Sequence, residues 1–301
     1  MRGRSGGAPA PGTASIVTSR RTEWDGLPPP PGLRDGASRR PVLGVDFSGA
    51  SDAGKRIWLA HARQEAGVLQ IVACQRGDSL DGSAPGRGSC LSALRRRLVA
   101  SPAVVGMDFP FGLPSGLVEE PSWEEFVLNF AVRYPTAQAF RQACRKAAPR
   151  ELRRRTDTRA RTPFSPYNLR LYLQTFHGIR DVLQPLVRQG MASVLPMQRP
   201  DADLPWVIEV CPASTLKALA LYVPYKGSGA ERRAARKRVI ESIEAMGLWS
   251  MSPVARQAAV ENPGGDALDS ALAALGAFRG LSVACAGGSN SEAAVEGQVY
   301  F

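Results

Sequence analysis

Histidine and paired cysteines are scarce in this sequence. It has two histidines, His61 and His177, among 301 residues, and its five cysteines are scattered without a Cys-x-x-Cys pair. Zinc sites and disulfide frameworks are built from these residue types. The shortage argues against a zinc site, a disulfide framework and a histidine-based metal site. It also disfavours a Ser-His-Asp triad, although a single histidine would be enough to serve one.

Long apolar runs are missing as well. The sequence has no stretch of about 18 apolar residues, the length that a membrane-spanning helix needs. Its N-terminus has no apolar core of the kind that signal peptides contain. The sequence therefore predicts a cytoplasmic protein without a membrane span.

Acidic residues are outnumbered by basic ones, 27 to 38, which gives a formal net charge of +11 and a pI of about 10.0. Residues 1–40 are rich in Gly, Pro, Ser and Arg and predict a disordered or extended tail; they hold seven arginines and three acids, a net charge of +4. Subtracting this from +11 leaves +7 for residues 41–301. Such a surplus favours a polyanionic partner, above all nucleic acid, while a basic proteome or a basic tail is the alternative explanation.

A glycine-rich segment, residues 48–55 (SGASDAGK), contains a partial match to a nucleotide-binding motif. Gly49–Lys55 fits the G-x-x-x-x-G-K pattern of a phosphate-binding loop. That motif needs Ser or Thr after the lysine and a helix after the loop, but the next residue is Arg56 and residues 57–74 resemble two strands joined by a tight turn. We therefore interpret residues 48–55 as a flexible hairpin loop.

The spacing of apolar residues predicts the order of the elements. Three consecutive strands are expected between residues 42 and 74, a fourth at 103–108 and a fifth at 206–211. Helices are expected at residues 90–101, in several stretches of 122–190, and after residues 214, 230 and 266. Pro185 should kink the last helix of the 122–190 segment. This order indicates an α/β domain with a mixed sheet over residues 41–301, with a helical insertion at about residues 120–200.

Acidic residues at strand ends are the most informative feature. Asp46 ends the first predicted strand, Asp108 ends the fourth, and Glu209 lies within the fifth. A charge in a buried strand is costly unless it is paired or binds a cation. One such acid is readily explained as a partner in a structural salt bridge, but three acids on separate strands of one sheet favour a functional site.

The last predicted helix adds Asp266 and Asp269, which lie about 60° apart on one face. The same face continues with small residues, Ser270, Ala273 and Ala277. An acidic first helical turn is by itself explained by the helix dipole. The small residues indicate instead a face that presses closely against another element.

Carboxylates converging from several elements match the needs of a hard cation. Mg²⁺ or Mn²⁺ binds oxygen ligands, and a two-metal site needs several acids close together. Asp46, Asp108, Asp266 and Asp269 would supply them without any histidine.

A basic stretch between Arg141 and Arg161 is opposed only by Glu151 and Asp157. Aromatic residues follow closely after it, at Phe164, Tyr167 and Tyr172. Arginines with aromatic rings suit a phosphate backbone and stacked bases. A solvated helix surface is the alternative interpretation.

Six segments of the chain together resemble a known family. In order, they read LGVDFSG, VVGMDFPFGLP, RRRTD, WVIEVCPAS, DALDSALAAL and VEGQVYF, and they span residues 42–301. The set is similar to an uncharacterised family of predicted ribonuclease H-like nucleases. This resemblance implies a ribonuclease H-like α/β fold, with a three-strand meander followed by alternating helices and strands, and a magnesium-dependent nuclease activity.

The resemblance also implies roles for individual residues. Asp46 would bridge two metal ions and Asp108 would bind one of them, while Asp266 and Asp269 would bind the second. Glu209 and Glu296 match acids of the family, and Glu209 is included among the predicted catalytic residues. Arg155 and Asp157 match a basic-acidic motif that would contact phosphate. The predicted phosphate contacts are Arg154, Arg155 and Arg159.

Two alternative functions remain open at this stage. A phosphotransferase of the actin and sugar-kinase type shares the strand meander, but a second phosphate loop and a second copy of the meander are not found in the sequence. A non-catalytic nucleic-acid-binding protein would keep the fold and the positive charge, and would bind in a salt-sensitive way without need of a metal.

Overall fold

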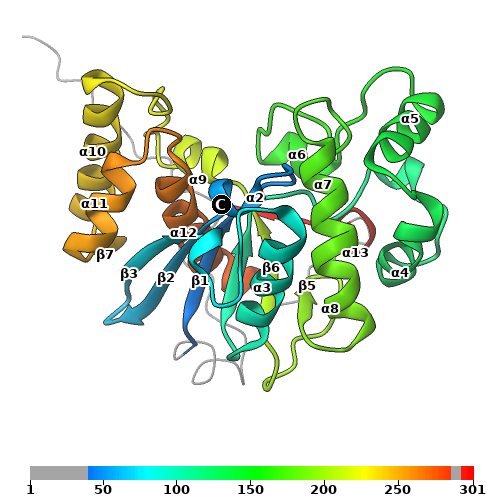
Figure 1. Cartoon of the computed structure of the whole chain (residues 1–301), viewed down its shortest axis with the longest axis horizontal. Coiled ribbons are helices and arrows are strands. Elements are labelled where there is room, and N and C mark those ends of the chain that lie inside the picture. Colours follow the sequence, from blue (N-terminus) through cyan, green and yellow to red (C-terminus); the bar gives the residue numbers. More distant parts are fainter. Residues whose placement is uncertain (1–39, 286–292) are drawn as a thin grey trace, which may run out of the picture.

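A mixed eight-stranded sheet forms the centre of the molecule, whose computed structural model describes residues 40–285 and 293–301 (Figure 1). The strand order is β5-β6-β4-β1-β2-β3-β7, and β8 pairs with β6. The strands are β1 (Val42–Asp46), β2 (Trp58–Glu65), β3 (Val68–Arg76), β4 (Val104–Met107), β5 (Ser193–Leu195), β6 (Trp206–Val210), β7 (Trp249–Met251) and β8 (Val299–Tyr300). β1, β2 and β3 form the predicted antiparallel meander, and the remaining pairings are parallel.

The predicted α/β architecture with a mixed sheet is confirmed. The three-residue strands β5 and β7 were not predicted, and residues 299–300 form the short strand β8. Almost the whole predicted tail, residues 1–39, lies outside the described residues, so its conformation stays a prediction. Within the described part of the chain, no helix is both long and apolar enough to cross a membrane.

Successive side chains of each strand point to opposite faces of the sheet and belong to two separate hydrophobic layers. On β1, Leu43 and Val45 belong to one buried cluster, while Val42 belongs to the other. β4 repeats this pattern with Val105 and Val104. Because successive strand residues point to opposite faces, each face of the sheet needs its own cover of helices.

One face is covered by helices from the second half of the chain (Figure 1). These helices are α9 (Pro212–Ala218), α10 (Ala230–Ala245), α11 (Pro253–Glu261) and α12 (Asp266–Cys285). α12 contacts β1, β2 and β4 directly. Glycines on two adjacent strands, Gly44 and Gly106, pair with each other and let this helix approach. A Cβ atom on Gly44 would lie 2.0 Å from the carbonyl oxygen of Ser270, and one on Gly106 would lie 2.5 Å from that of Ala273.

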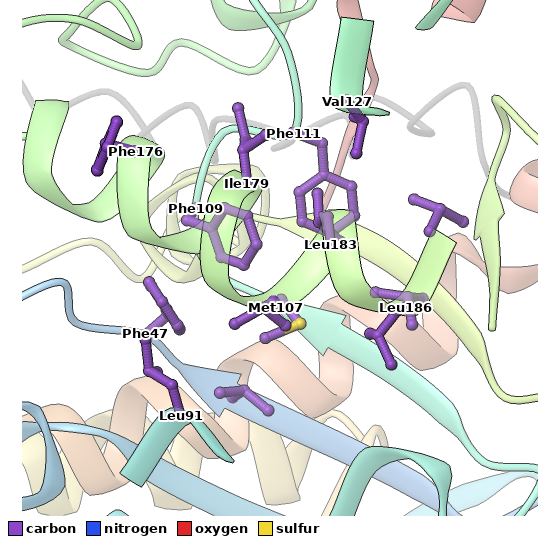
Figure 2. Packing of buried hydrophobic residues seen from close by; sticks show 14 of the residues in the cluster. Phe47, Leu91, Met107, Phe109, Phe111, Val127, Phe176, Ile179, Leu183 and Leu186 are labelled. Atoms are coloured by element: carbon purple, nitrogen blue, oxygen red, sulfur yellow. The ribbon is translucent and has the colours of Figure 1, made fainter. Parts of the chain in front are cut away.

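The other face is covered by helices of the first half and of the insertion, a name used here for residues 120–200. These helices are α3 (Arg87–Val99), α4 (Trp123–Arg133), α5 (Ala137–Ala147), α6 (Arg155–Arg159), α7 (Tyr172–Gly178) and α8 (Gln184–Arg188). Figure 2 shows Phe109 and Phe111 packed beneath the continuous α7–α8 segment, beside Ile179 and Leu183. Ser122 caps the start of α4, because its side chain accepts a hydrogen bond from the backbone N–H of Glu125 (3.2 Å).

Pro185 interrupts the longest predicted helix of the insertion. The chain forms a π-helical segment, η3 (Ile179–Leu183), between α7 and α8. Proline has no N–H to donate to the carbonyl group four residues before it, which is that of Asp181. Arg95 of α3 donates to this oxygen instead (2.5 Å). The freed backbone group therefore joins the insertion to α3.

The connection from β1 to β2 is more ordered than predicted. Instead of a plain hairpin loop, it contains a four-residue helix, α2 (Ala53–Arg56). Gly49 lies so close to the insertion that a Cβ atom there would be 2.3 Å from the carbonyl oxygen of Leu173. The remaining short elements are η1 (Gly77–Ser79), η2 (Ser115–Leu117) and α13 (Ala293–Glu296).

Candidate active site

Asp46 and Asp108 lie together at the carboxyl end of the sheet. Asp46 is the last residue of β1, and Asp108 directly follows β4, which runs parallel to β1. Asp108 donates its backbone N–H to the carbonyl oxygen of Val45 (3.0 Å). The phenylalanines that follow the two acids, Phe47 and Phe109, belong to the buried layer under the insertion, with ring centroids 4.7 Å apart. Because successive side chains point to opposite faces, the carboxylates of Asp46 and Asp108 point toward the α12 side of the sheet.

The first turn of α12 brings Asp266 and Asp269 to the same edge. The predicted small-residue face does press against another element, because Ser270 and Ala273 meet the glycines of β1 and β4. Asp269 is buried, with 3% of its side chain exposed, while Asp266 is partly buried. The close approach of helix and sheet therefore gathers four aspartates from three elements.

A cavity of about 430 Å³ opens at this edge. Its lining includes Asp46, Asp108 and Asp266, and the insertion contributes Phe164, Leu171 and Gln174. Gln174 donates its side-chain amide to the backbone carbonyl oxygen of Asp108, which ties α7 to the end of β4. The insertion thus lies against the acidic edge, and the acids and the insertion share one cleft.

The aspartates that line the cavity have too few positively charged groups near them to balance their negative charge. Burial and then the negative charge of Asp269 raise the pKa of Asp46 well above its usual range. The same two causes raise the pKa of Asp108 to about 7. Burial also raises the pKa of Asp266. Carboxylates shifted in this direction are stabilised by a bound cation.

The loop between α9 and α10 adds two residues that were not predicted. Tyr225 donates its hydroxyl to one carboxylate oxygen of Asp269, and the Lys226 ammonium lies 2.5 Å from the other. Burial lowers the pKa of Lys226, but the carboxylates of Asp269, Asp46 and Asp108 raise it by more, so the net shift is upward. Three elements separate this loop from α12 in the chain, so no short-range spacing in the sequence could have revealed the contact.

Glu209 lines the same cavity as Asp46, Asp108 and Asp266, and, besides burial, its negative charge contributes to the raised pKa of Asp108. It pairs in register with Met107, and like Met107 it faces the insertion side of the sheet. Its carboxylate accepts from the backbone N–H of Phe111 (3.0 Å) and from Arg154 (2.8 Å). The register therefore turns Glu209 to the insertion face, where Phe111 and Arg154 bind its carboxylate, and its predicted catalytic role stays a prediction.

Arg154 is buried in a network, with 1% of its side chain exposed. Its guanidinium donates to both oxygens of Asp157, both oxygens of Glu209 and the backbone carbonyl of Glu296. These contacts use all five N–H donors of an arginine. Arg154 thus has no donor left for a substrate phosphate, in contrast to its predicted role.

The carboxylate of Glu296 is also bound by groups of the protein itself. Its side chain accepts hydrogen bonds from the backbone N–H groups of Ser115 (2.8 Å) and Arg155 (2.9 Å). The network of Arg154, Asp157, Glu209 and Glu296 therefore joins α6 to β6 and to the C-terminal residues. The side chains of Arg155 and Arg159 are exposed on the five-residue helix α6. This helix adjoins the cavity wall, which includes Asp157 and Thr162.

The donor set suits a hard divalent cation. The four aspartates provide oxygen ligands of the kind that Mg²⁺ and Mn²⁺ bind, and the raised pKa values of three of them reflect a deficit of positive charge. Over residues 40–285 and 293–301, no three His, Cys, Asp or Glu side chains form a closed group of ligands as they stand. The residue types suit a metal ion, although the described side chains are not preset around one.

Comparisons with known proteins identify a family. Residues 44–287 match the family described as "Protein of unknown function (DUF429)". A crystal structure of a yeast mitochondrial Holliday junction resolvase is similar with 12% sequence identity and a TM-score of 0.33, over 83% of this chain and 82% of that chain. No curated protein matches the chain.

Proposed function

The chain belongs to the DUF429 family, and we propose that it is a divalent-metal-dependent nuclease with a ribonuclease H-like fold. One observation carries the proposal. Asp46, Asp108 and Asp266, with pKa values raised by burial, line one cavity at the carboxyl end of adjacent parallel strands. Open α/β sheets bind their ligands at this edge. The meander β1–β2–β3, followed by the parallel strands β4 and β6, supports the fold assignment.

A nucleic-acid substrate is supported by the charge around the cavity. The insertion forms one wall and carries exposed basic residues, among them Arg145, Arg150, Arg155 and Arg159. Phosphate contacts of this kind supply affinity without regard to base sequence. Phe164 lines the cavity and offers an aromatic ring on which a base can stack. The Arg170 guanidinium lies 5.1 Å from the centre of this ring.

Different residues of the site have different roles in the proposed reaction. Asp46, Asp108 and Asp266 hold the divalent cation, and Arg155 and Arg159 attract the phosphate backbone. Phe164 and Leu171 limit the access of water from the insertion side. When bound, Mg²⁺ or Mn²⁺ supplies Lewis acidity at a phosphate oxygen and lowers the pKa of a coordinated water. Arg154 and Glu209 hold the insertion in place over the sheet.

The test is a cleavage assay with the full chain and a panel of single-stranded, duplex, hybrid and branched nucleic acids, with Mg²⁺ or Mn²⁺ present. The variant Asp46→Asn removes a charge and keeps the size of the side chain. We expect it to lower cleavage by about 100-fold or more, which corresponds to about 2.7 kcal/mol of barrier. The exposed Asp81→Asn variant is the matched control and should cleave like the wild type.

Cleavage by Asp46→Asn at the wild-type rate, or cleavage that persists in a chelator, would contradict the proposal. If neither protein cleaves and both still bind nucleic acid, the non-catalytic binder is the better account. Such binding would be salt-sensitive and indifferent to the metal.

A further inference from the structure

Lys226 is held at the acidic edge by a loop with many internal contacts. Gly227 donates its backbone N–H to the carbonyl oxygen of Pro263 (2.7 Å), and the buried Arg236 donates to the carbonyl oxygens of Tyr225 (2.7 Å) and Gly227 (3.1 Å). The loop also packs tightly against Gly265, since a Cβ atom there would lie 3.1 Å from Cγ of Lys226. The stem of the lysine is therefore fixed beside the start of α12.

The carboxylate of Asp269 is fully engaged on the Lys226 side of the site. One oxygen accepts from the hydroxyl of Tyr225 and the other contacts the ammonium of Lys226 at 2.5 Å. Asp269 is absent from the cavity lining, whereas Lys226 is part of it. Asp269 thus faces the lysine, and the lysine faces the cavity.

Lys226 lines the same cavity as Asp46, Asp108 and Asp266. More than half of its side chain, 56%, is exposed, while its ammonium group contacts Asp269. An ammonium has three N–H donors, and Asp269 takes one of them, which leaves donors for a phosphate oxygen in the cavity.

We propose that Lys226 serves as the second cation of this site, so that the chain holds one divalent ion rather than two. Asp46, Asp108 and Asp266 hold that ion, and Asp269 is a positioning residue that keeps Lys226 over the cavity. This inference rests on the proposed metal-dependent function and changes its detail. It replaces the two-metal arrangement expected from the sequence with one metal ion and one ammonium group.

The number of ions bound per chain tests this directly, without any activity measurement. Full-length protein is titrated with Mn²⁺, and the free ion is counted by electron paramagnetic resonance. We expect one Mn²⁺ per wild-type chain and two per Lys226→Met chain, because methionine keeps the unbranched stem and removes the charge. Lys55→Met, at an exposed position on α2, is the control and should bind one ion.

The outcomes separate the two proposals. Two ions in the wild type, or one ion in both the wild type and Lys226→Met, would overturn the role of Lys226 and leave the metal-dependent function standing. No bound ion in the wild type, or binding unchanged in Asp46→Asn, would overturn the metal site itself. Thermal unfolding of each variant verifies that it is folded, and Lys226→Met should unfold at a lower temperature than the wild type because the buried Asp269 loses its cation.

Discussion

At the scale of single residues, the site contains more buried negative charge than the protein neutralises. Four aspartates converge, and Lys226 is the cation in direct contact with one of them. Burying a carboxylate without a partner is costly, so such a group takes up a proton or binds a cation. The metal-free protein therefore holds protons where the loaded protein would hold an ion.

The pKa of Asp108, raised to about 7, predicts how metal binding depends on pH. The folded carboxyl binds protons more tightly than the unfolded one, whose pKa is about 3.9, so the metal-free protein loses stability as pH rises from about 4 to 7. A metal ligand must be deprotonated. We expect Mn²⁺ affinity to rise by up to about tenfold per pH unit below 7 and to level off above it. The raised pKa of Asp46 acts in the same direction.

Calorimetric titration with Mn²⁺ at pH 6, 7 and 8 measures this dependence. Asp81→Asn serves as the control for charge changes outside the site and should follow the wild-type curve. An affinity that is flat between pH 6 and pH 8 would show that no carboxyl with a raised pKa takes part in binding.

Arg154 predicts a loss of stability that is distinct from a loss of substrate binding. Arg154→Ala would leave Glu209 and Asp157 buried without their partner, which should cost about 3–5 kcal/mol of unfolding free energy. The neighbouring Arg159→Ala, at an exposed position, should change stability by less than about 0.5 kcal/mol and weaken nucleic-acid binding instead. Urea unfolding and a binding titration separate the two effects. Wild-type stability in Arg154→Ala would contradict the structural role of the network.

At the scale of elements, the position of the acids depends on how closely α12 lies on the sheet. Gly44 and Gly106 are neighbours across the β1–β4 pair, and each faces backbone atoms of this helix. A side chain on either strand at this point would push the helix outward. The site thus depends on two residues without side chains, at a distance from the carboxylates themselves.

Gly44→Ala is expected to destabilise the fold and to weaken metal binding together. Its methyl group would meet the backbone of Ser270 and Ala274 on α12, and overpacking of this kind costs about 1–3 kcal/mol. Gly88→Ala on α3, where a Cβ atom meets nothing within 4 Å, is the control and should be neutral or slightly stabilising. Thermal unfolding and Mn²⁺ titration measure both effects. If Gly44→Ala bound Mn²⁺ like the wild type, the spacing between helix and sheet would not control the site.

The elements differ in how well the sequence predicts them. The meander and the long helices have strong apolar periodicity, and Asp46, Asp108, Asp266 and Asp269 could be identified because each follows or begins such an element. The contact of Glu209 with Arg154 could not be predicted, because the two residues are 55 positions apart in sequence. The edge strands β5 and β7 are three residues long, too short for a pattern.

At the scale of the whole molecule, the insertion and the sheet form one cleft because several contacts join them. Gln174 binds the backbone at Asp108, Arg154 binds Glu209, and Gly49 lies against the backbone of α7. These pairs are 55 or more residues apart in sequence, so no local pattern predicts them. They place the basic insertion beside the acidic edge, which is the arrangement that the proposed nuclease needs.

The most direct measurement is a crystal structure of the full chain grown with Mn²⁺, with the ion located by its anomalous scattering. The account predicts a peak about 2.0–2.6 Å from carboxylate oxygens of Asp46 and Asp108, the range for hard cations with oxygen ligands, and it predicts that Lys226 still contacts Asp269. A map without a peak at this edge of the sheet, or with Mn²⁺ bound only elsewhere on the chain, would contradict the account.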